Sequence, residues 1–519
     1  MIVDHLPILP VVLPAFAGAL LLLVHGNIRP RRAIGIAATL AYLVVAVLLL
    51  ERAIAAGPVV YETGDWPAPF GIVLVADRLA ALMILVLGLI AVCAVVYARA
   101  GWDTRGRYFH AFFQFQLMGI SGAFLTGDLF NLFVFFEVLL IASYCLLLHG
   151  LGAARVRAAV HYVVLNLIGS ALFLIAAALL YGVTGTLNIA HLAVRVGELA
   201  PADQPVAAAA GLILFVVFAL KAASFPMHFW LPAAYAAAAA PVAALFAIMT
   251  KVGVYAIVRI FGVVFGADAG PLAQLASPWL LPLAIATMIA GVLGALASRR
   301  LAEMVAFLTV SSVGTMLVGL VPGTEESVSG SLFYMVHSTF TVAALFLVAE
   351  LLGARRGPAG DEFVPAPRMA KPLVLGTLFV VGAASIVGLP PFSGFLGKVM
   401  ILQGTSANAA APWIWASILG VGFLMLIGVA RGGAVIFWAN APGAPGVSPG
   451  YASAGALLPA MALASAGIGM AVFAAPIKAY TDAAAGEVVH PQRYVEAVLA
   501  ASGGSKAAMR KPLPAVNER

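Results

Sequence analysis

The chain has 519 residues, of which 63% are hydrophobic and 9% are charged, and its mean hydropathy is +1.07. Soluble globular domains carry about 25% charged residues, so this composition excludes one and predicts an all-α polytopic membrane protein. The net charge of +7 does not indicate nucleic acid, because the basic residues fall in short loops between apolar runs. The two cysteines, Cys93 and Cys145, each lie inside an apolar run, which predicts neither a disulfide framework nor a metal site.

The N-terminal residues MIVDHLPILP contain an acid and no Lys or Arg. They lack the positive region of a signal peptide, so we expect a retained first span. Runs of about 17–25 apolar residues predict membrane-spanning helices. Fourteen such runs lie near residues 6–24, 33–50, 79–98, 110–126, 128–149, 159–182, 206–225, 240–262, 276–297, 301–320, 328–352, 371–389, 413–437 and 455–475. Two further features are a short interfacial helix expected at Gly71 to Arg78, and an apolar segment that resumes after Pro390-Pro391 to about Leu402.

Lysines and arginines are distributed unevenly between the two sides of the predicted membrane. With the N-terminus outside, the inner loops hold Arg29, Arg31, Arg32, Arg99, Arg105, Arg107, Arg155, Arg157, Arg299, Arg300, Arg355, Arg356, Arg368, Lys371 and Arg431. The outer loops and span ends, without the C-terminal tail, hold Arg52, Arg78, Arg195 and Arg259. This positive-inside bias sets the orientation and places the tail from about residue 476 outside.

Glu137 is an acidic side chain deep in the fifth span. It lies nine residues into that run, about 14 Å deep in a hydrocarbon core of about 30 Å. An ionised carboxylate at this depth needs a partner, and Lys221 is the natural one. Removal of one member of such a pair costs about 3–5 kcal/mol. A structural ion pair that pins two helices is the alternative interpretation.

Three lysines remain once the loop and tail residues are set aside, and all three lie in predicted spans: Lys221, Lys251 and Lys398. Burial disfavours a charged lysine and a nearby carboxylate favours it, so a lysine whose distance from its carboxylate changes can bind and release a proton. His337 lies in a polar part of the eleventh span and is expected to relay protons between Lys251 and Lys398; a hydrogen-bonded packing histidine is the alternative.

Two spans are interrupted by proline near a lysine. They read LKAASFPMHFWLP in the seventh span, with Pro226 and His228, and GLPPFSGFLGKV in the twelfth, with Pro390 and Pro391. Such breaks are tolerated at depth where protein or a wet cavity covers them. We expect His228 to cap the inner-face end of the first break; a proton-relay role is the alternative. Interrupted spans at corresponding positions of two halves are typical of inverted-repeat transporters.

The predicted organisation follows from these breaks. Helices 1–3 occupy residues 1–109, a first five-helix repeat residues 110–265, and a second, inverted repeat residues 266–440. Helix 14 occupies residues 441–475, and the C-terminal tail, residues 476–519, is expected to lie along a neighbouring subunit.

The runs KAASFPMHFWLP, MTKVGVYAIVRI, SRRLAEMVAFLTVSSVG and GLPPFSGFLGKV resemble the antiporter-like family shared by Mrp-type cation/proton antiporters and respiratory complex I, over residues of about 70–440. TGDLFNLFVFFEV and PQRYVEAVL are similar to the D-type subunits of the Mrp group. The resemblance implies fourteen helices with broken helices 7 and 12. It also implies a Glu137–Lys221 pair, a central Lys251, a relay through His337 and a terminal Lys398. Two positions depart from the family pattern: Thr341 and Val342 stand where many members carry a lysine, and Tyr235 stands where many carry a histidine.

The favoured function is a proton-translocating subunit of a multisubunit Na⁺/H⁺ or K⁺/H⁺ antiporter in the bacterial inner membrane, with other subunits and lipid as partners. The alternative is a proton-pumping subunit of complex I or a membrane-bound hydrogenase. A membrane scaffold without transport is the third interpretation. The sequence holds no cysteine cluster, nucleotide-binding glycine motif or haem motif, so we expect a secondary transporter subunit without enzyme chemistry or cofactor. Asp128 and Glu137 are the two weak candidates for binding Na⁺.

Overall fold

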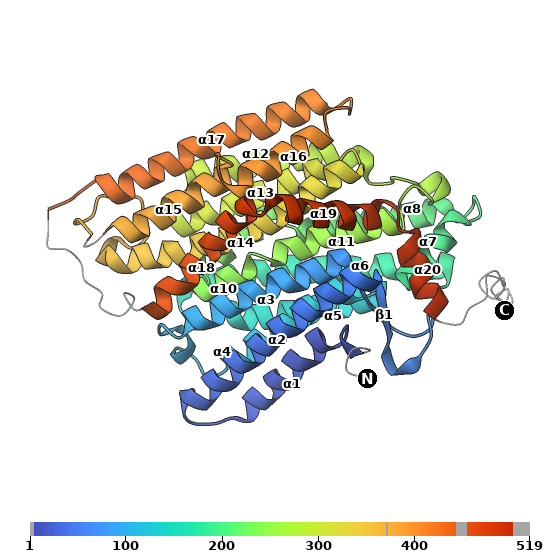
Figure 1. Cartoon of the computed structure of the whole chain (residues 1–519), viewed down its shortest axis with the longest axis horizontal. Coiled ribbons are helices and arrows are strands. Elements are labelled where there is room, and N and C mark those ends of the chain that lie inside the picture. The colour runs from blue at the N-terminus through green and yellow to red at the C-terminus, as the bar shows by residue number, and fades with distance from the viewer. Residues whose placement is uncertain (1–4, 370–371, 443–453, 502–519) are drawn as a thin grey trace.

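The computed structural model describes residues 5–369, 372–442 and 454–501, and the long helices in these ranges run roughly side by side (Figure 1). The helices are α1 (Leu9–Leu23), α2 (Ile28–Ala56), α3 (Arg78–Ala98), α4 (Phe109–Leu125), α5 (Leu129–Leu147), α6 (Ala153–Thr184), α7 (Ile189–Gly197), α8 (Gln204–Lys221), α9 (Trp230–Ala237), α10 (Ala240–Phe246), α11 (Met249–Val263), α12 (Ser277–Ala297), α13 (Leu301–Leu320), α14 (Glu325–Arg355), α15 (Pro372–Val387), α16 (Ser393–Gly404), α17 (Ala411–Trp438), α18 (Ala454–Val472), α19 (Ala474–Val489) and α20 (Gln492–Ala501).

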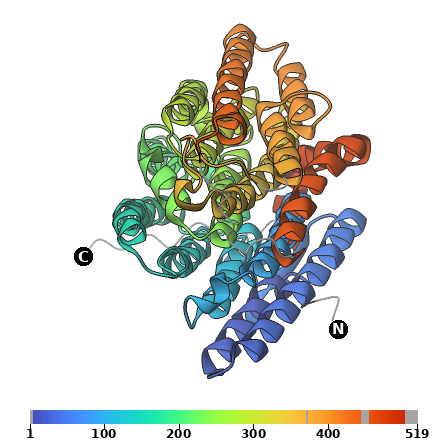
Figure 2. The same cartoon turned by 90° about the vertical axis from the view of Figure 1, so that its left-hand side faces the viewer.

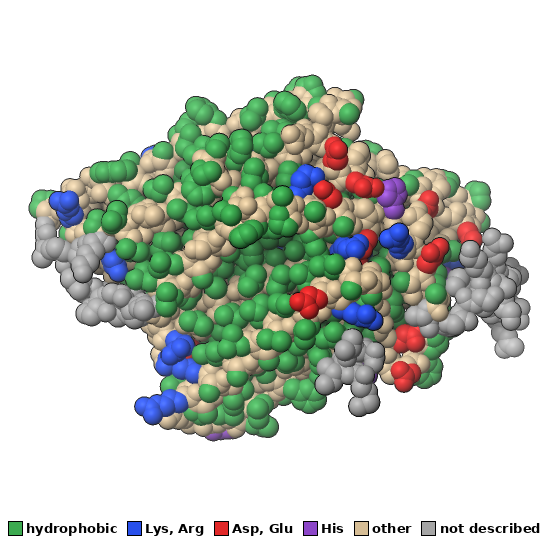
Figure 3. All heavy atoms as spheres, in the orientation of Figure 1, with side chains coloured by type: hydrophobic (Ala, Val, Ile, Leu, Met, Phe, Trp, Pro, Cys, Tyr) green, Lys and Arg blue, Asp and Glu red, His purple; other side chains and the backbone are tan. Residues whose placement is uncertain are grey.

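Eleven segments of the described residues are long and apolar enough to cross a membrane, and α1 and α15 are shorter apolar helices. The chain is therefore a predominantly helical, multi-pass membrane protein, and every predicted span coincides with a helix or a pair of helices. Seen from the side, the N-terminal helices (blue) lie at the bottom, the helices drawn in orange at the top, and the teal and green helices at the left (Figure 2). On the face shown in Figure 3, Lys and Arg side chains lie toward both ends of the helices, whereas the acidic side chains lie toward the right. Lys371, counted among the inner basic residues, lies outside the described residues.

Close helix packing repeats in the two five-helix sets. A Cβ atom at Gly119 of α4 would lie 2.6 Å from the backbone nitrogen of Leu139 in α5, and one at Gly291 of α12 would lie 2.4 Å from that of Ser311 in α13. Small residues allow this approach, because no hydrophobic drive brings helices together in lipid. The same spacing of glycine and contact residue recurs five spans later in the chain, and helices an odd number of spans apart run in opposite directions.

Two predicted segments differ from the observed structure. The interfacial helix expected at Gly71 to Arg78 is wrong: β2 (Val73–Ala76) is a buried strand that pairs antiparallel with β1 (Val59–Glu62). Its apolar, largely β-branched residues suit a strand, and Gly127 donates its N–H to the carbonyl of Val73 at 2.8 Å. The eighth span is divided between α10 and α11, a break that the sequence analysis did not predict.

The described part of the C-terminal tail packs on the chain's own helices. α19 contacts α14, α3 and α11, and α20 contacts α7 and β1. Glu487 forms an ion pair with Arg78 at 2.5 Å, and the hydroxyl of Tyr480 donates to the carbonyl of Arg78 at 2.7 Å. These polar contacts join α19 to the start of α3. The expectation that the tail lies along a neighbouring subunit stays a prediction.

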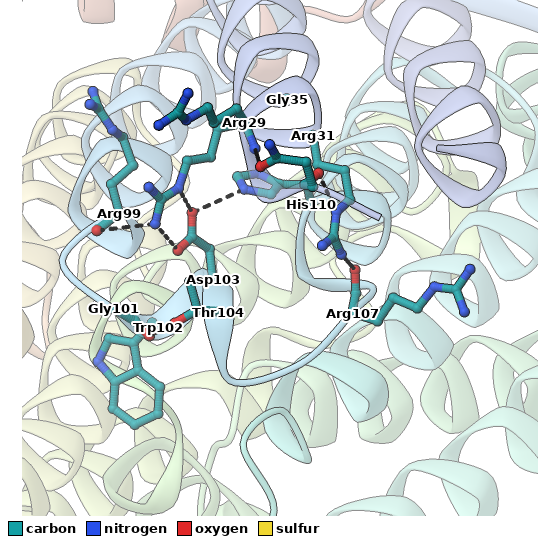
Figure 4. A network of polar contacts seen from close by, with 12 residues as sticks. Arg29, Arg31, Gly35, Arg99, Gly101, Trp102, Asp103, Thr104, Arg107 and His110 are labelled. Carbon is teal, nitrogen blue, oxygen red and sulfur yellow. Dashed lines mark hydrogen bonds and ion pairs between the residues drawn. The ribbon is translucent and has the colours of Figure 1, made fainter. Parts of the chain in front are cut away.

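An ion-pair cluster joins the start of α2 to the start of α4 (Figure 4). Arg32 donates to both oxygens of Asp103, at 2.6 and 2.7 Å, and Nε2 of His110 lies 3.3 Å from the same carboxylate. Burial by itself raises the pKa of Asp103, but the hydrogen bonds from Arg32 and His110 outweigh it and hold this pKa at about 2. A Cβ atom at Gly35 would lie 2.7 Å from Nδ1 of His110, so α2 and α4 are in close contact here.

Candidate functional site

Glu137 and Lys221 do not touch each other in the structure. The hydroxyl of Ser170 donates to Oε1 of Glu137, and Nζ of Lys221 donates to Oδ1 of Asn166 at 3.3 Å. Asn166 and Ser170 lie four residues apart and therefore project from one face of α6. The direct ion pair expected from the sequence is thus replaced by two separate hydrogen bonds to α6, with Glu137 and Lys221 still within electrostatic range of each other.

Lys221 is the last residue of α8, at the first helix break. Its side chain is 5% exposed, and Nζ lies 5.5 Å from the ring centroid of Phe136. The indole N–H of Trp230 donates to the carbonyl of Leu220 at 3.0 Å. The hydroxyl of Thr287 in α12 accepts from the backbone N–H of Phe225 at 3.0 Å. The backbone groups freed by the break are therefore partly satisfied by side chains of the protein.

His228 does not cap this break. It lies in the short turn Met227–Phe229, and its ring packs against Phe225 and Phe229 at centroid distances of 6.0 and 4.3 Å. Its Nδ1 is buried without a hydrogen-bond partner. The cap role expected of His228 is wrong, since Trp230 takes the nearby free carbonyl instead.

Lys251 is the central lysine of the candidate site. It lies in the first turn of α11, its side chain is 0% exposed, and Nζ has no hydrogen-bond partner. Thr250 is buried next to it, with an equally unpartnered hydroxyl. A Cβ atom at Gly253 would lie 2.3 Å from the backbone nitrogen of Ala222. This close contact places α11 directly against the end of α8, so Lys251 lies on the helix that crosses the break at Lys221.

His337 lies at the middle of α14 and is fully buried. Its Nδ1 is 2.8 Å from the hydroxyl of Ser393 and 3.4 Å from that of Thr341, whereas its Nε2 has no partner. The ring is within electrostatic range of both Lys251 and Lys398. The position agrees with the sequence expectation; its role in proton transfer stays a prediction.

Lys398 is located on α16, after the second break. Its side chain is 7% exposed, and Nζ donates to the carbonyl of Val387 at 2.7 Å. Val387 is the last residue of α15, and Pro390 and Pro391 follow it. The lysine therefore satisfies a carbonyl that the interrupted helix leaves without an intrahelical donor.

The two candidate Na⁺ ligands do not form one site. Asp128 caps α5, where Oδ1 accepts from the backbone N–H of Asn131 at 2.8 Å. Glu137 lies nine residues farther along the same helix, which corresponds to about 14 Å. Within residues 5–369, 372–442 and 454–501, no group of three or more His, Cys, Asp or Glu is placed to hold a metal ion.

Residues 126–427 match the family model described as "NADH:quinone oxidoreductase/Mrp antiporter, TM". The chain is 39% identical to a Rhizobium meliloti protein named as the D subunit of a probable K⁺/H⁺ antiporter, over 96% of this chain and 98% of that protein. It is 36% identical to the D subunit of the Na⁺/H⁺ antiporter of Bacillus subtilis, over 96% of this chain and 99% of that protein. The chain belongs to the NADH:quinone oxidoreductase/Mrp antiporter family. The resemblance inferred from the sequence is confirmed.

Solved structures of this family have the same fold. One chain of the Mrp complex from Dietzia sp. DQ12-45-1b superposes with a TM-score of 0.85 at 28% identity, over 96% of this chain and 100% of that one. A chain of respiratory complex I from Thermus thermophilus gives a TM-score of 0.75 at 26% identity, over 93% and 99%. The Mrp-type and redox-driven members therefore share one architecture with this chain.

Sequence reasoning missed the side chains that hold the charged groups of this family member. Ser170 binds Glu137, Asn166 binds Lys221, and Ser393 binds His337. A detectable signal for the first two was present, since Asn166 and Ser170 are polar residues one turn apart in the otherwise apolar run LNLIGSALFL. Ser393 carries no such signal, because its contact depends on how α16 packs against α14.

Proposed function

We propose that this chain is the proton-translocating subunit of a multisubunit monovalent cation/proton antiporter in a bacterial inner membrane. Inward proton flow drives Na⁺ or K⁺ out, and other subunits of the complex surround the chain. The near full-length similarity to relatives named as D subunits of K⁺/H⁺ and Na⁺/H⁺ antiporters supports this function. The similarity to a chain of a solved Mrp complex supports assembly with partners.

Lys251 is the observation that carries the proposal. It is a fully buried side chain near the middle of a segment long and apolar enough to cross a membrane, and no acceptor in the described residues binds its Nζ. A charged side chain at the bilayer centre costs about 2.5–3.5 kcal/mol on insertion scales, and such residues are rare unless they serve transport. A structural pin needs a partner, which Lys251 does not have. A group that gains and loses a proton needs no fixed partner in the protein, because water serves as its transient partner.

Protons are relayed along Glu137, Lys221, Lys251, His337 and Lys398. Each step changes the charge of one site and thereby the proton affinity of its neighbours. Two unit charges about 10 Å apart interact by roughly 1.7 kcal/mol at an effective dielectric constant of 20, which corresponds to more than a tenfold change in an equilibrium. Neighbouring sites therefore alternate in occupancy rather than fill independently, and this alternation links proton movement across the two repeats.

The test uses everted vesicles from an antiporter-deficient strain that expresses the whole complex. Respiration builds a pH gradient, and its collapse on addition of Na⁺, K⁺ or Li⁺ is followed with a pH-sensitive dye. Lys221→Ala and Lys251→Ala are expected to abolish the collapse while the complex still assembles. The matched control is Lys478→Ala, because Lys478 is half exposed and pairs only with Asp482 one turn away. Unchanged activity in both buried-lysine variants contradicts the proposal.

A redox-driven pump is the second candidate. The likeness to complex I and to a membrane-bound sulfane sulfur reductase, which has a TM-score of 0.84 at 26% identity, favours it over a scaffold. The membrane chemistry is the same in this case and only the driving reaction differs. Co-purification of the complex with an iron–sulfur or flavin subunit, together with no cation-dependent collapse, selects this function.

A further inference from the structure

A second deeply buried charge lies on the same helix as Lys251. Arg259, which the sequence analysis counted with the outer span ends, is 3% exposed and lies inside α11. Its two terminal nitrogens donate to the carboxylate of Asp77, at 2.5 and 2.8 Å. Asp77 is itself 1% exposed and caps α3 by accepting from the N–H of Ala80 at 2.9 Å. The proposed relay does not use this pair.

Arg259 is aligned with the central lysine. Lys251, Tyr255 and Arg259 follow one another at intervals of four residues and therefore lie along one face of α11. Arg259 is about 12 Å farther along the helix than Lys251, toward the outer end. Its nitrogens donate to the hydroxyl of Tyr255 at 2.9 and 3.3 Å, and that hydroxyl donates to the carbonyl of Phe124. Hydrogen bonds thus connect Tyr255 through Arg259 to Asp77 at the start of α3, and Lys251 lies one turn from Tyr255 on the same face of α11.

The C-terminal helices cover the outer end of this line. The ring of Tyr494 in α20 lies 4.9 Å from the guanidinium of Arg259. Tyr494 is 2% exposed, and its hydroxyl has no hydrogen-bond partner. A Cβ atom at Gly262 would lie 3.1 Å from the side chain of Val488, so α19 packs tightly on α11. Figure 1 shows α19 beside α11, and α20 crossing the right-hand helix ends near α7.

We propose that Asp77 and Arg259, closed over by Tyr494, form the outer gate of the proton path, and that Asp77 exchanges protons between the outside and Lys251. This inference rests on the proposed function. In the inward direction the carboxylate of Asp77 takes a proton from outside water, which weakens its pairing with Arg259. The hydroxyl of Tyr255 then passes a proton through water to the neutral amine of Lys251. It takes the proton of Asp77 through a second water, since the two groups share one nitrogen of Arg259. At the end Asp77 is again a carboxylate and Lys251 is an ammonium.

A structural pin between α3 and α11 is the competing explanation for this pair. Removal of one partner leaves an uncompensated buried charge in either case, so a single variant does not separate the two. The double variant Asp77→Asn with Arg259→Gln removes both charges. This double variant leaves no unpaired ion, so a purely structural pair would tolerate it. It also leaves no carboxylate to carry the proton, so a gate would not. Lys478→Ala is the matched control, because Lys478 lies on the neighbouring α19, is half exposed and pairs with Asp482 one turn away, so its removal leaves no buried charge.

The experiment measures cation-dependent collapse of the pH gradient in everted vesicles, with assembly of the complex checked by native gel electrophoresis. The double variant is expected to assemble and to lose about 100-fold or more of the activity, in the range for a removed proton-transfer group. Asp77→Glu, which keeps a carboxylate, is expected to retain part of it. Lys478→Ala is expected to stay within about threefold of the wild type, because it breaks an exposed pair. Wild-type activity in the double variant overturns the gate.

Tyr255→Phe tests the link to Lys251 without any change of charge. It is expected to lower the same activity, and wild-type activity in this variant also overturns the inference. Failure of the proposed function gives a different result. In that case the wild-type complex shows no cation-dependent collapse, or Lys221→Ala matches the wild type, whatever the variants at Asp77 do.

Discussion

Ser170→Ala is expected to slow antiport by freeing Glu137 from α6. In the structure the hydroxyl of Ser170 is the donor that holds the carboxylate of Glu137, while Asn166 holds Lys221 one turn away. A hydrogen bond to a charged group contributes about 1.5–3 kcal/mol, which corresponds to roughly a 10- to 150-fold change in an equilibrium. Without it, Glu137 turns toward Lys221 and a direct ion pair forms. A lysine locked in such a pair releases its proton more slowly, so we expect about a tenfold or larger loss of turnover.

The assay is the initial rate of cation-dependent collapse of the pH gradient, normalised to the amount of assembled complex. Ser170→Thr keeps the hydroxyl and is expected to retain most of the rate. Asn166→Ala removes the hydrogen bond that holds Lys221. It is expected to lower the rate as well, since it frees Lys221 to move toward Glu137. Equal rates in Ser170→Ala, Ser170→Thr and the wild type refute the reasoning, because they show that the α6 hydrogen bonds do not control the separation of Glu137 and Lys221.

Three further predictions concern other parts of the chain. Lys398→Arg keeps the charge and the donors but is expected to abolish antiport, because a guanidinium does not release its proton; retained transport contradicts a proton-carrying role. Gly119→Ala puts a Cβ 2.6 Å from a backbone nitrogen, about 1 Å short of ordinary contact. It is expected to cost about 1–3 kcal/mol and lower the melting temperature, whereas Gly420→Ala, with nothing within 4 Å, is not. Asp103→Asn is expected to lower the free energy of unfolding by about 2 kcal/mol at neutral pH. The pKa of Asp103 is lowered to about 2, so its ionised form stabilises the fold above about pH 4 and this stabilisation is lost as the pH falls through about 2. Equal thermal stability of the variant and the wild type at pH 7 argues against this prediction.

The sequence by itself determined the class of protein, the spans and the identity of the central charged residues. These follow from one-dimensional quantities: the length of an apolar run must match the bilayer, and a charge within such a run is costly wherever it lies. Lys251 therefore stood out without any structure. The proline pairs marked the breaks for the same reason, because proline removes a backbone donor locally.

The tertiary structure alone decided which groups touch. Glu137 and Lys221 are on different helices, and only the position of α6 shows that Ser170 and Asn166 hold them apart. The sequence analysis placed Arg259 at an outer span end, because its partner Asp77 precedes another helix and is far away in sequence. Hydrogen bonds extend over about 3 Å, so the rotation and crossing of the helices decide which side chains become partners. A helix that is apolar on all sides has no polar face in its sequence that would specify its rotation.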